Sequence, residues 1–337
     1  MQQSDARSSE AGLLIVLGAL VLAAALVSLM LGSAHLPLSS VIRGLFGASD
    51  TVTNAIVRDI RLPRVLLSFL VGGVLGISGA ALQGYMRNPL AEPATLGLSN
   101  SAALGAVIAL YYGYAAQSQW ALPLFAIATA MIAMLLLMGL IRLSDGTLTL
   151  ILGGIAIGTL SGAAISLALN LSPNPFAAME ITFWMLGSVE DRTMQQVLLV
   201  LPFAAAGMGL LLWDRNALDA LSLGEETAQS LGFNLKRVEM RLMVAIALGV
   251  GASVAVSGSI AFVGLVVPHI LRPWTGGKPS RLLLPSALAG AALLTAADIL
   301  VRIIPSTNEL RLGVVTAFLG TPFFLHLLLR SRTNRWT

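Results

Sequence analysis

Residues 11–32 read AGLLIVLGALVLAAALVSLMLG, a run of 22 residues without a charged side chain. A spanning helix needs about 20 apolar residues, whereas the apolar core of a signal peptide has about 7–15. The preceding residues hold Arg7 against Asp5 and Glu10, so the positive segment that begins a signal peptide is missing. We therefore expect a membrane-spanning helix over 11–32, with cleavage as the minor alternative.

The composition of the whole chain also indicates a membrane protein. Of its 337 residues, 56% are apolar and 11% are charged, and the mean hydropathy is +0.86. Soluble domains carry about 25% charged residues, so this chain lacks the side chains that coat a soluble surface. The net charge of +4 does not indicate nucleic-acid binding, because 18 of the 20 basic residues are arginines scattered between apolar runs.

The residue content also argues against several kinds of active site. The chain has no cysteine, which excludes disulfides, thiolate metal sites, iron–sulfur clusters and cysteine nucleophiles. His35, His269 and His326 lie far apart in sequence, so we expect no metal centre. The sequence has no Gly-x-x-x-x-Gly-Lys-Ser/Thr loop, no His-Glu-x-x-His and no Gly-x-Ser-x-Gly motif. We expect no catalytic residues, and any ATP must be hydrolysed by a partner.

Apolar runs recur along the chain and predict an all-α fold. Ten runs are candidate spans: 11–32, 64–86, 97–116, 120–141, 147–171, 194–213, 241–257, 259–273, 282–304 and 311–329. The run 259–273 would form a helix only about 22 Å long, so we expect it to be partial or displaced and covered by protein. The prediction is one transmembrane domain over residues 1–337, a polytopic helical bundle with about ten spans.

Arginine and lysine counts predict the orientation of this bundle. With ten spans and both termini in the cytoplasm, thirteen basic residues fall in cytoplasmic segments and seven in outer segments. Basic residues are enriched on the cytoplasmic side, so this arrangement is favoured. Four of the seven outer arginines lie within 43–64, and that concentration requires its own explanation.

Two connections stand out between the runs. Residues 33–63 contain an amphipathic stretch, 38–46, that suits the membrane interface. Residues 214–240 form the longest cytoplasmic segment, in which we expect two short helices that serve as a docking platform. There Ser222 is expected to cap a helix with Glu225 three residues later, and Gly232 is expected to end it.

Asp298 is the clearest charged residue inside an apolar run, with Arg302 four residues later on the same helical face. A structural ion pair is the favoured interpretation. A proton-relay site would need further carboxylates at a matching depth, and the sequence does not supply them.

Glycines form two patterns in the runs, Gly72-xxx-Gly76 and Gly154-xxx-Gly158-xxx-Gly162. Small residues on one helical face let backbones approach closely. We expect these faces to pack within one chain, and a subunit interface is the alternative.

Several motifs, in a fixed order, carry a resemblance to a known family. They are Arg61-Leu-Pro-Arg64, Gly79-Ala-Ala-Leu-Gln-Gly84, Asn88-Pro-Leu-Ala-Glu-Pro93, Leu96-Gly-Leu-Ser-Asn100, Leu223-Gly-Glu-Glu-Thr-Ala228, Phe262-Val-Gly-Leu-Val-Val-Pro-His-Ile270, Ala297-Asp-Ile299 and Gly313-Val-Val-Thr-Ala317. From about residue 12 to residue 330 the chain resembles the FecCD/BtuC-type permeases. These are the membrane subunits of ABC importers for iron chelates, haem and vitamin B12.

The resemblance implies a type II ABC importer permease architecture with ten helices per subunit. It implies a homodimer in the bacterial inner membrane, with the translocation path between the subunits. It also implies two cytoplasmic ATPase subunits, which bind ATP and magnesium, and a periplasmic substrate-binding protein. No cofactor is expected on this chain. The substrate class is a ferric siderophore, haem or cobalamin, with Asn88-Pro-Leu-Ala-Glu-Pro93 slightly closer to the vitamin B12 branch.

The resemblance also assigns three groups of residues in this sequence. Docking of the binding protein falls to Arg61, Arg64 and Arg302, and the inner gate to Thr147 and Leu148. Coupling to the ATPase falls to residues of the cytoplasmic segment 214–240: Leu223, Gly224, Glu225, Glu226, Ala228, Leu231 and Gly232.

One departure from the family pattern concerns partner docking. The family has Glu-Leu-Pro before the last span, whereas this chain has Glu309-Leu-Arg-Leu312. Arg311 adds an outer positive charge there.

Two other classes of protein remain as alternatives. An ion-coupled secondary transporter of a small solute would need acidic residues at the midplane or broken helices that bind ions. A membrane enzyme would need a polar catalytic cluster within the spans, and none is found.

Overall fold

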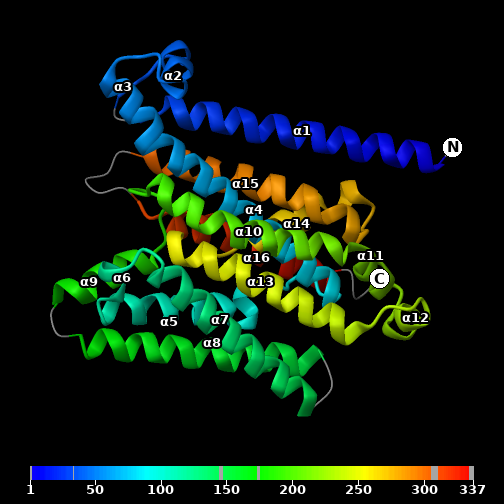
Figure 1. Cartoon of the computed structure of the whole chain (residues 1–337). Helices are drawn as coiled ribbons and strands as arrows, with labels where there is room; N and C mark the ends of the chain where they lie inside the picture. Colours follow the sequence, from blue (N-terminus) through cyan, green and yellow to red (C-terminus); the bar gives the residue numbers. More distant parts are fainter. Residues whose placement is uncertain (1, 33, 144–146, 173–174, 305–309, 334–337) are drawn as a thin grey trace.

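The computed structural model describes residues 2–32, 34–143, 147–172, 175–304 and 310–333, and within these ranges it contains helices and no strand. Figure 1 shows the long helices lying side by side in one bundle. A helix lies at every predicted run: α1 (Gln2–Met30), α4 (Leu62–Tyr85), α5 (Leu98–Tyr111), α7 (Ala121–Leu143), α8 (Thr147–Asn170), α10 (Met194–Trp213), α13 (Leu235–Ser257), α14 (Val263–Leu271), α15 (Pro279–Ile303) and α16 (Leu312–Thr333). The predicted all-α transmembrane bundle is confirmed.

Not all of these helices have the length of a span. Within the described residues, seven helical stretches are long and apolar enough to cross a membrane, while the apolar part of α5 and of α16 is shorter. Helix α14 has 9 residues, about 14 Å, and follows a break at residues 258–262. The expectation that the run 259–273 forms a partial helix is therefore confirmed, and the count of ten spans is approximate.

Short helices join the long ones. They are α2 (Leu38–Leu45), α3 (Thr51–Ala55), the π-helical segment η1 (Ile56–Arg61), the 3-10 turn η2 (Pro93–Leu96), α6 (Tyr114–Gln117), α9 (Pro175–Met185), α11 (Arg215–Ser222), α12 (Glu225–Ser230) and the 3-10 turn η3 (Arg272–Thr275). Helix α2 buries Val41 and exposes Phe46 just after its end, as the amphipathic pattern predicts.

Helices α4 and α15 form the central pair of the bundle. A Cβ atom added to Gly72 or to Gly290 would collide with the carbonyl oxygen of the other, and one added to Gly76 would collide with that of Ser286. These glycines allow the two backbones to touch, which strengthens dispersion contacts between the helices. Packing within one chain is thus confirmed for the Gly72-xxx-Gly76 pattern.

The second glycine pattern splits between two environments. Gly154 and Gly158 of α8 lie against the backbone of Leu96 and Gly97, which leads into α5. Gly162, two turns further along α8 from Gly154, has open space beside it. The intrachain interpretation therefore holds for Gly154 and Gly158 only.

The two ends of the bundle carry different elements. Figure 1 shows α11, α12, the start of α1 and the start of α8 at one end, which we call the platform end. The first turn of α4 and the last turns of α15 lie at the opposite end with α2 and α3, which we call the arginine end.

Candidate functional site

The arginine end is organised by an ion cluster centred on Asp298. Arg64 donates its Nε hydrogen to both carboxylate oxygens of Asp298, at 3.0 and 3.2 Å. Arg302 donates to Asp298 Oδ2 at 2.7 Å from one turn along α15. All three side chains are buried, with Asp298 only 2% exposed, so the contacts form in a poorly hydrated environment. The pairing of Asp298 with Arg302 predicted from sequence is confirmed, and Arg64 is an additional partner.

Two arginines of this end also cap helix α1. Arg61 donates to the carbonyl oxygens of Leu29 and Met30, at 2.7 and 3.0 Å, and to that of Ala34. Arg302 donates to the carbonyl oxygen of Ser28 at 2.9 Å. The last carbonyls of a helix have no partner within it and form the negative end of its dipole, so both contacts stabilise the end of α1.

A cavity of about 220 Å³ opens beside this cluster, lined by Arg61, Arg64 and Arg302 together with Glu190 and Asp191. The structure thus brings together the three arginines that the resemblance assigns to docking. It also gives each of them partners within the chain. Their role toward a binding protein stays a prediction.

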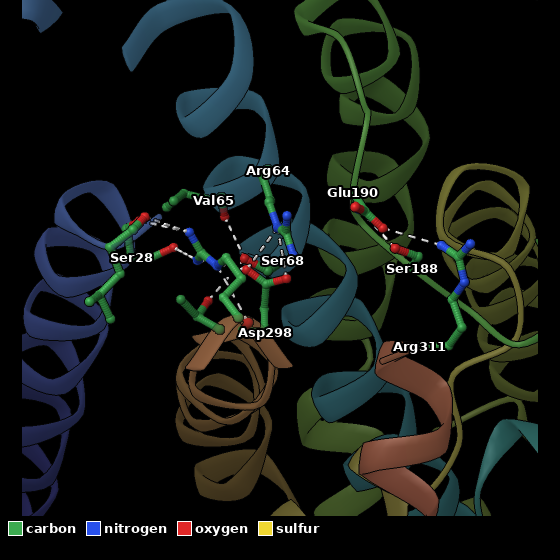
Figure 2. A network of polar contacts seen from close by, with 11 residues as sticks. Ser28, Arg64, Val65, Ser68, Ser188, Glu190, Asp298 and Arg311 are labelled. Atoms are coloured by element: carbon green, nitrogen blue, oxygen red, sulfur yellow. Dashed lines mark hydrogen bonds and ion pairs between the residues drawn. The ribbon is translucent and has the colours of Figure 1, made fainter. Parts of the chain in front are cut away.

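Arg311 lies in a separate contact at the same end. Its Nη1 atom is 3.3 Å from Glu190 Oε2, and its guanidinium carbon lies 5.5 Å from the centre of the Phe183 ring. Figure 2 shows the Arg311–Glu190 pair apart from the cluster of Arg64 and Asp298. Arg311 therefore joins the start of α16 to the connection between α9 and α10.

The platform end holds two short helices within 214–240, as predicted. The predicted cap is wrong, because Ser222 is the last residue of α11 and donates to the carbonyl oxygen of Asp219 at 2.6 Å. Gly224 precedes α12 instead, with φ at 112°, a conformation that residues with a Cβ atom rarely adopt. Gly232, with φ at 89°, follows the end of α12 as expected, and the amide of Phe233 closes a Schellman motif on Ala228 O at 3.1 Å.

Most coupling residues assigned by the resemblance lie on an exposed surface, which we call the exposed ridge and which includes Leu223, Glu225, Glu226 and Leu231. Leu223 and Leu231 are 69% and 61% exposed, and Glu225 and Glu226 are also exposed. Ala228 is fully buried and holds α12 on the bundle. Apolar side chains exposed beside acidic ones are typical of a protein-docking surface.

Polar contacts that the sequence did not predict tie this platform to the long helices. Asp219 of α11 accepts hydrogen bonds from the amide and hydroxyl of Ser280, at 2.8 and 2.6 Å, at the start of α15. Asp214 accepts a hydrogen bond from Arg241 of α13 at 2.9 Å. No sequence pattern links these pairs, because each joins residues that are distant along the chain.

Helix α8 begins at Thr147, and the start of this helix lies at the platform end (Figure 1). This agrees with an inner gate only in the position of the backbone, because the side chains of Thr147 and Leu148 lie outside the described part of the structure. No group of three His, Asp or Glu side chains that could hold a metal occurs within the described residues.

The model of the FecCD transport family matches residues 20–330, nearly the whole chain. The chain belongs to the FecCD transport family. As a FecCD permease it is a membrane subunit of an ABC importer for substrates of the metal-chelate and vitamin B12 type.

Individual relatives agree with this assignment. The FecCD permease is 40% identical over 313 residues to an uncharacterized ABC transporter permease protein, YvrB of Bacillus subtilis, covering 89% of this chain and 88% of that one. It is 42% identical over 291 residues to the vitamin B12 import system permease protein BtuC of Vibrio cholerae, covering 86% and 87%. A solved structure described as the inward-facing conformation of an ABC transporter of metal-chelate type matches with a TM-score of 0.84, 29% identity and coverage of 94% and 98%.

Proposed function

We propose that this FecCD permease imports a corrinoid such as cobalamin, or a metal chelate of similar size. The observation that supports this most is the 42% identity to a vitamin B12 permease over 86% of the chain. Ferric siderophore and haem are the other substrates to test.

The proposal includes ATPase subunits that dock at the platform end. Leu223, Leu231 and the two glutamates of α12 supply an exposed mixed surface there. Asp219 and Asp214 join that surface to α15 and α13, so a force on the platform reaches two long helices directly. ATP and magnesium bind to the partner subunits in this scheme, and rigid-body shifts open or close the path near the start of α8.

The proposal places the platform end in the cytoplasm. Thirteen of the 20 basic residues then lie in cytoplasmic segments, in agreement with the positive-inside rule. The proposal also places both chain termini on the cytoplasmic side of the inner membrane. The arginine end then faces the periplasm, where the binding protein docks.

We also propose that two copies form the transporter. Large apolar side chains remain exposed along α8, among them Leu152, Ile155 and Leu160, and on α16 at Phe318. Lipid covers part of such a surface, and a second copy covers the rest. Static light scattering of the detergent-purified permease, corrected for bound detergent, tests this: a mass of one chain contradicts it.

Docking of the binding protein at Arg61, Arg64 and Arg302 stays part of the proposal. Because Arg61 also caps α1, docking must be measured together with stability. If Arg61→Gln lowers the affinity for the binding protein and leaves the melting temperature unchanged, the result supports docking at this arginine. An unchanged affinity contradicts it, and Arg43→Gln is the matched control because Arg43 is exposed and lies outside the cavity.

The decisive experiment is uptake of labelled cobalamin, haem and a ferric siderophore by cells with and without the permease. Uptake of cobalamin that falls on deletion and returns on complementation supports the proposal. Loss of siderophore or haem uptake alone corrects the substrate. An ion-coupled secondary transporter is tested by inactivating the ATPase partner, because transport by such a carrier would persist.

A further inference from the structure

A second cavity lies at the platform end, away from the arginine cluster. It has a volume of about 230 Å³ and lies between the end of α4, the end of α11, η3 and the start of α15. Its lining includes two arginines, Arg87 and Arg272, with the hydroxyl-bearing Ser222 and the backbone of Gly277. Arg87, Ser222 and Gly277 are exposed, so the cavity is open to solvent at its rim.

Arg272 carries a charge that its surroundings do not balance. Among the described residues it makes no ion pair, and its Nη2 atom donates to the amide oxygen of Gln83 at 3.0 Å. Its Nε atom is buried without a hydrogen-bond partner in the described part of the chain. A guanidinium without an ion pair favours a neighbouring anion, because hydrogen bonds between charged groups are about twice as strong as those between neutral groups.

The carboxylates near the cavity already have partners. Glu225 lies 3.4 Å from Arg87 Nη2, in a pair whose side chains are both about half exposed or more. Asp219 accepts two hydrogen bonds from Ser280. Neither carboxylate forms an ion pair with Arg272 in the described part of the chain.

Gln83 fixes the direction in which Arg272 points. The amide nitrogen of Gln83 donates to the carbonyl oxygens of Gly264 and Leu265, both at 3.3 Å, which turns its own oxygen toward Arg272. Gln83 is buried and these contacts join α4 to α14. The guanidinium is thus held in place before any ligand arrives, which lowers the entropic cost of binding.

We propose that this cavity is a binding site for a phosphate-sized oxyanion, held by Arg272 and Arg87. A water molecule occupies about 30 Å³, so the cavity holds a phosphate ion with several waters. A guanidinium fork matches the oxygens of phosphate. The bound anion would connect α4, η3 and α11 at the base of the docking platform. This site is separate from the transported substrate and does not depend on its identity.

The test uses the full-length permease in nanodiscs of zwitterionic phosphatidylcholine and measures binding of ³²P-labelled orthophosphate by equilibrium dialysis. We expect saturable binding that weakens by about tenfold or more in Arg272→Gln and by a smaller factor in Arg87→Gln. Arg281→Gln is the matched control, because Arg281 pairs with Glu10 at 3.3 Å and does not line the cavity. It should bind phosphate as the unaltered protein does.

Size-exclusion chromatography and thermal unfolding show whether Arg272→Gln folds. If it does not, the Arg87→Gln variant still tests the proposal, because Arg87 is exposed. Absence of saturable phosphate binding by the unaltered permease overturns the proposal, and so does equal binding by a folded Arg272→Gln or Arg87→Gln variant. Binding of acetate without binding of phosphate would also overturn the proposal. That result would indicate that the cavity receives a carboxylate side chain of a partner protein. If added phosphatidic acid displaces the bound phosphate, the natural ligand of the cavity is a lipid headgroup. If phosphatidic acid does not displace it, the natural ligand is the free phosphate ion.

Discussion

Arg64 Nε lies 3.0 Å from Asp298 Oδ1, which joins the first turn of α4 to the end of α15 across 234 residues of sequence. Arg302 shares the same carboxylate. Two buried guanidiniums therefore share one buried carboxylate, and Nη1 of Arg302 also donates to the carbonyl oxygens of Ser28 and Leu31 at the end of α1. The cluster holds three helices together at the end where a binding protein is proposed to dock.

Asp298→Asn should destabilise the permease strongly. The change removes the negative charge that both Arg64 and Arg302 contact, and breaking a buried ion pair by removing one partner costs about 3–5 kcal/mol in proteins. Thermal or denaturant unfolding of the purified protein in detergent measures the loss. Glu225→Gln is the control, because its pair with Arg87 is exposed at 49% and 62% and should contribute at most about 1 kcal/mol. Equal stability of the two variants would show that the buried cluster contributes no more than an exposed pair.

Gly76→Val should disrupt the contact between α4 and α15. The new side chain would collide with the carbonyl oxygen of Ser286, and backbone cannot move aside as a flexible side chain does. We expect a loss of about 1–3 kcal/mol or failure to accumulate in the membrane. Gly139→Ala in α7 has open space around it and should be neutral or stabilising, since alanine is the better helix former. Membrane yield and melting temperature of both variants test this, and a fully stable Gly76→Val would mean that the helices are not in contact.

The sequence predicts the helices well because the length of an apolar run of residues identifies a membrane-spanning helix. The partial helix in the run 259–273 is predicted too, because a helix of that length is too short to cross the membrane, and in the structure it follows non-helical residues 258–262. Local pairs such as Asp298 and Arg302 follow from helical spacing alone.

Contacts between distant segments could not be predicted in this way. The partnership of Arg64 with Asp298, and that of Asp219 with Ser280, arise from tertiary packing and leave no periodic pattern. The cap at Ser222 was predicted wrongly because residue types alone do not show that α11 extends through it. The positive φ at Gly224, which sets the start of α12, is likewise a property of the folded backbone.

Asp219→Ala should uncouple ATP hydrolysis from transport if the platform drives α15. The variant loses two hydrogen bonds to Ser280 at the start of that helix, while the exposed ridge of α12 stays intact. We expect ATPase activity of the assembled transporter to remain and uptake per ATP to fall several-fold, since hydrogen bonds to a charged group contribute about 1.5–3 kcal/mol each. Gln229→Ala changes an exposed side chain on the same platform that is not among the assigned coupling residues, so it controls for general damage to the surface. An unchanged uptake-to-hydrolysis ratio in Asp219→Ala would show that force reaches the spans by another route.

Gly224→Ala isolates the role of backbone conformation in the platform. The nearest atom to an added Cβ is Thr227 Oγ1 at 3.9 Å, so the methyl group meets no obstacle. The cost comes from the backbone itself, because φ of 112° with ψ of 154° is a region reached essentially by glycine alone, and strain there costs about 1–3 kcal/mol. We expect faster amide hydrogen exchange over 225–232 with little change in the spans, and weaker coupling of ATPase activity to uptake. Gly113→Ala, which also has positive φ and open space but lies outside the platform, should strain its own turn and leave coupling intact. If both variants reduced coupling equally, or neither did, the conformation at Gly224 would have no special role in it.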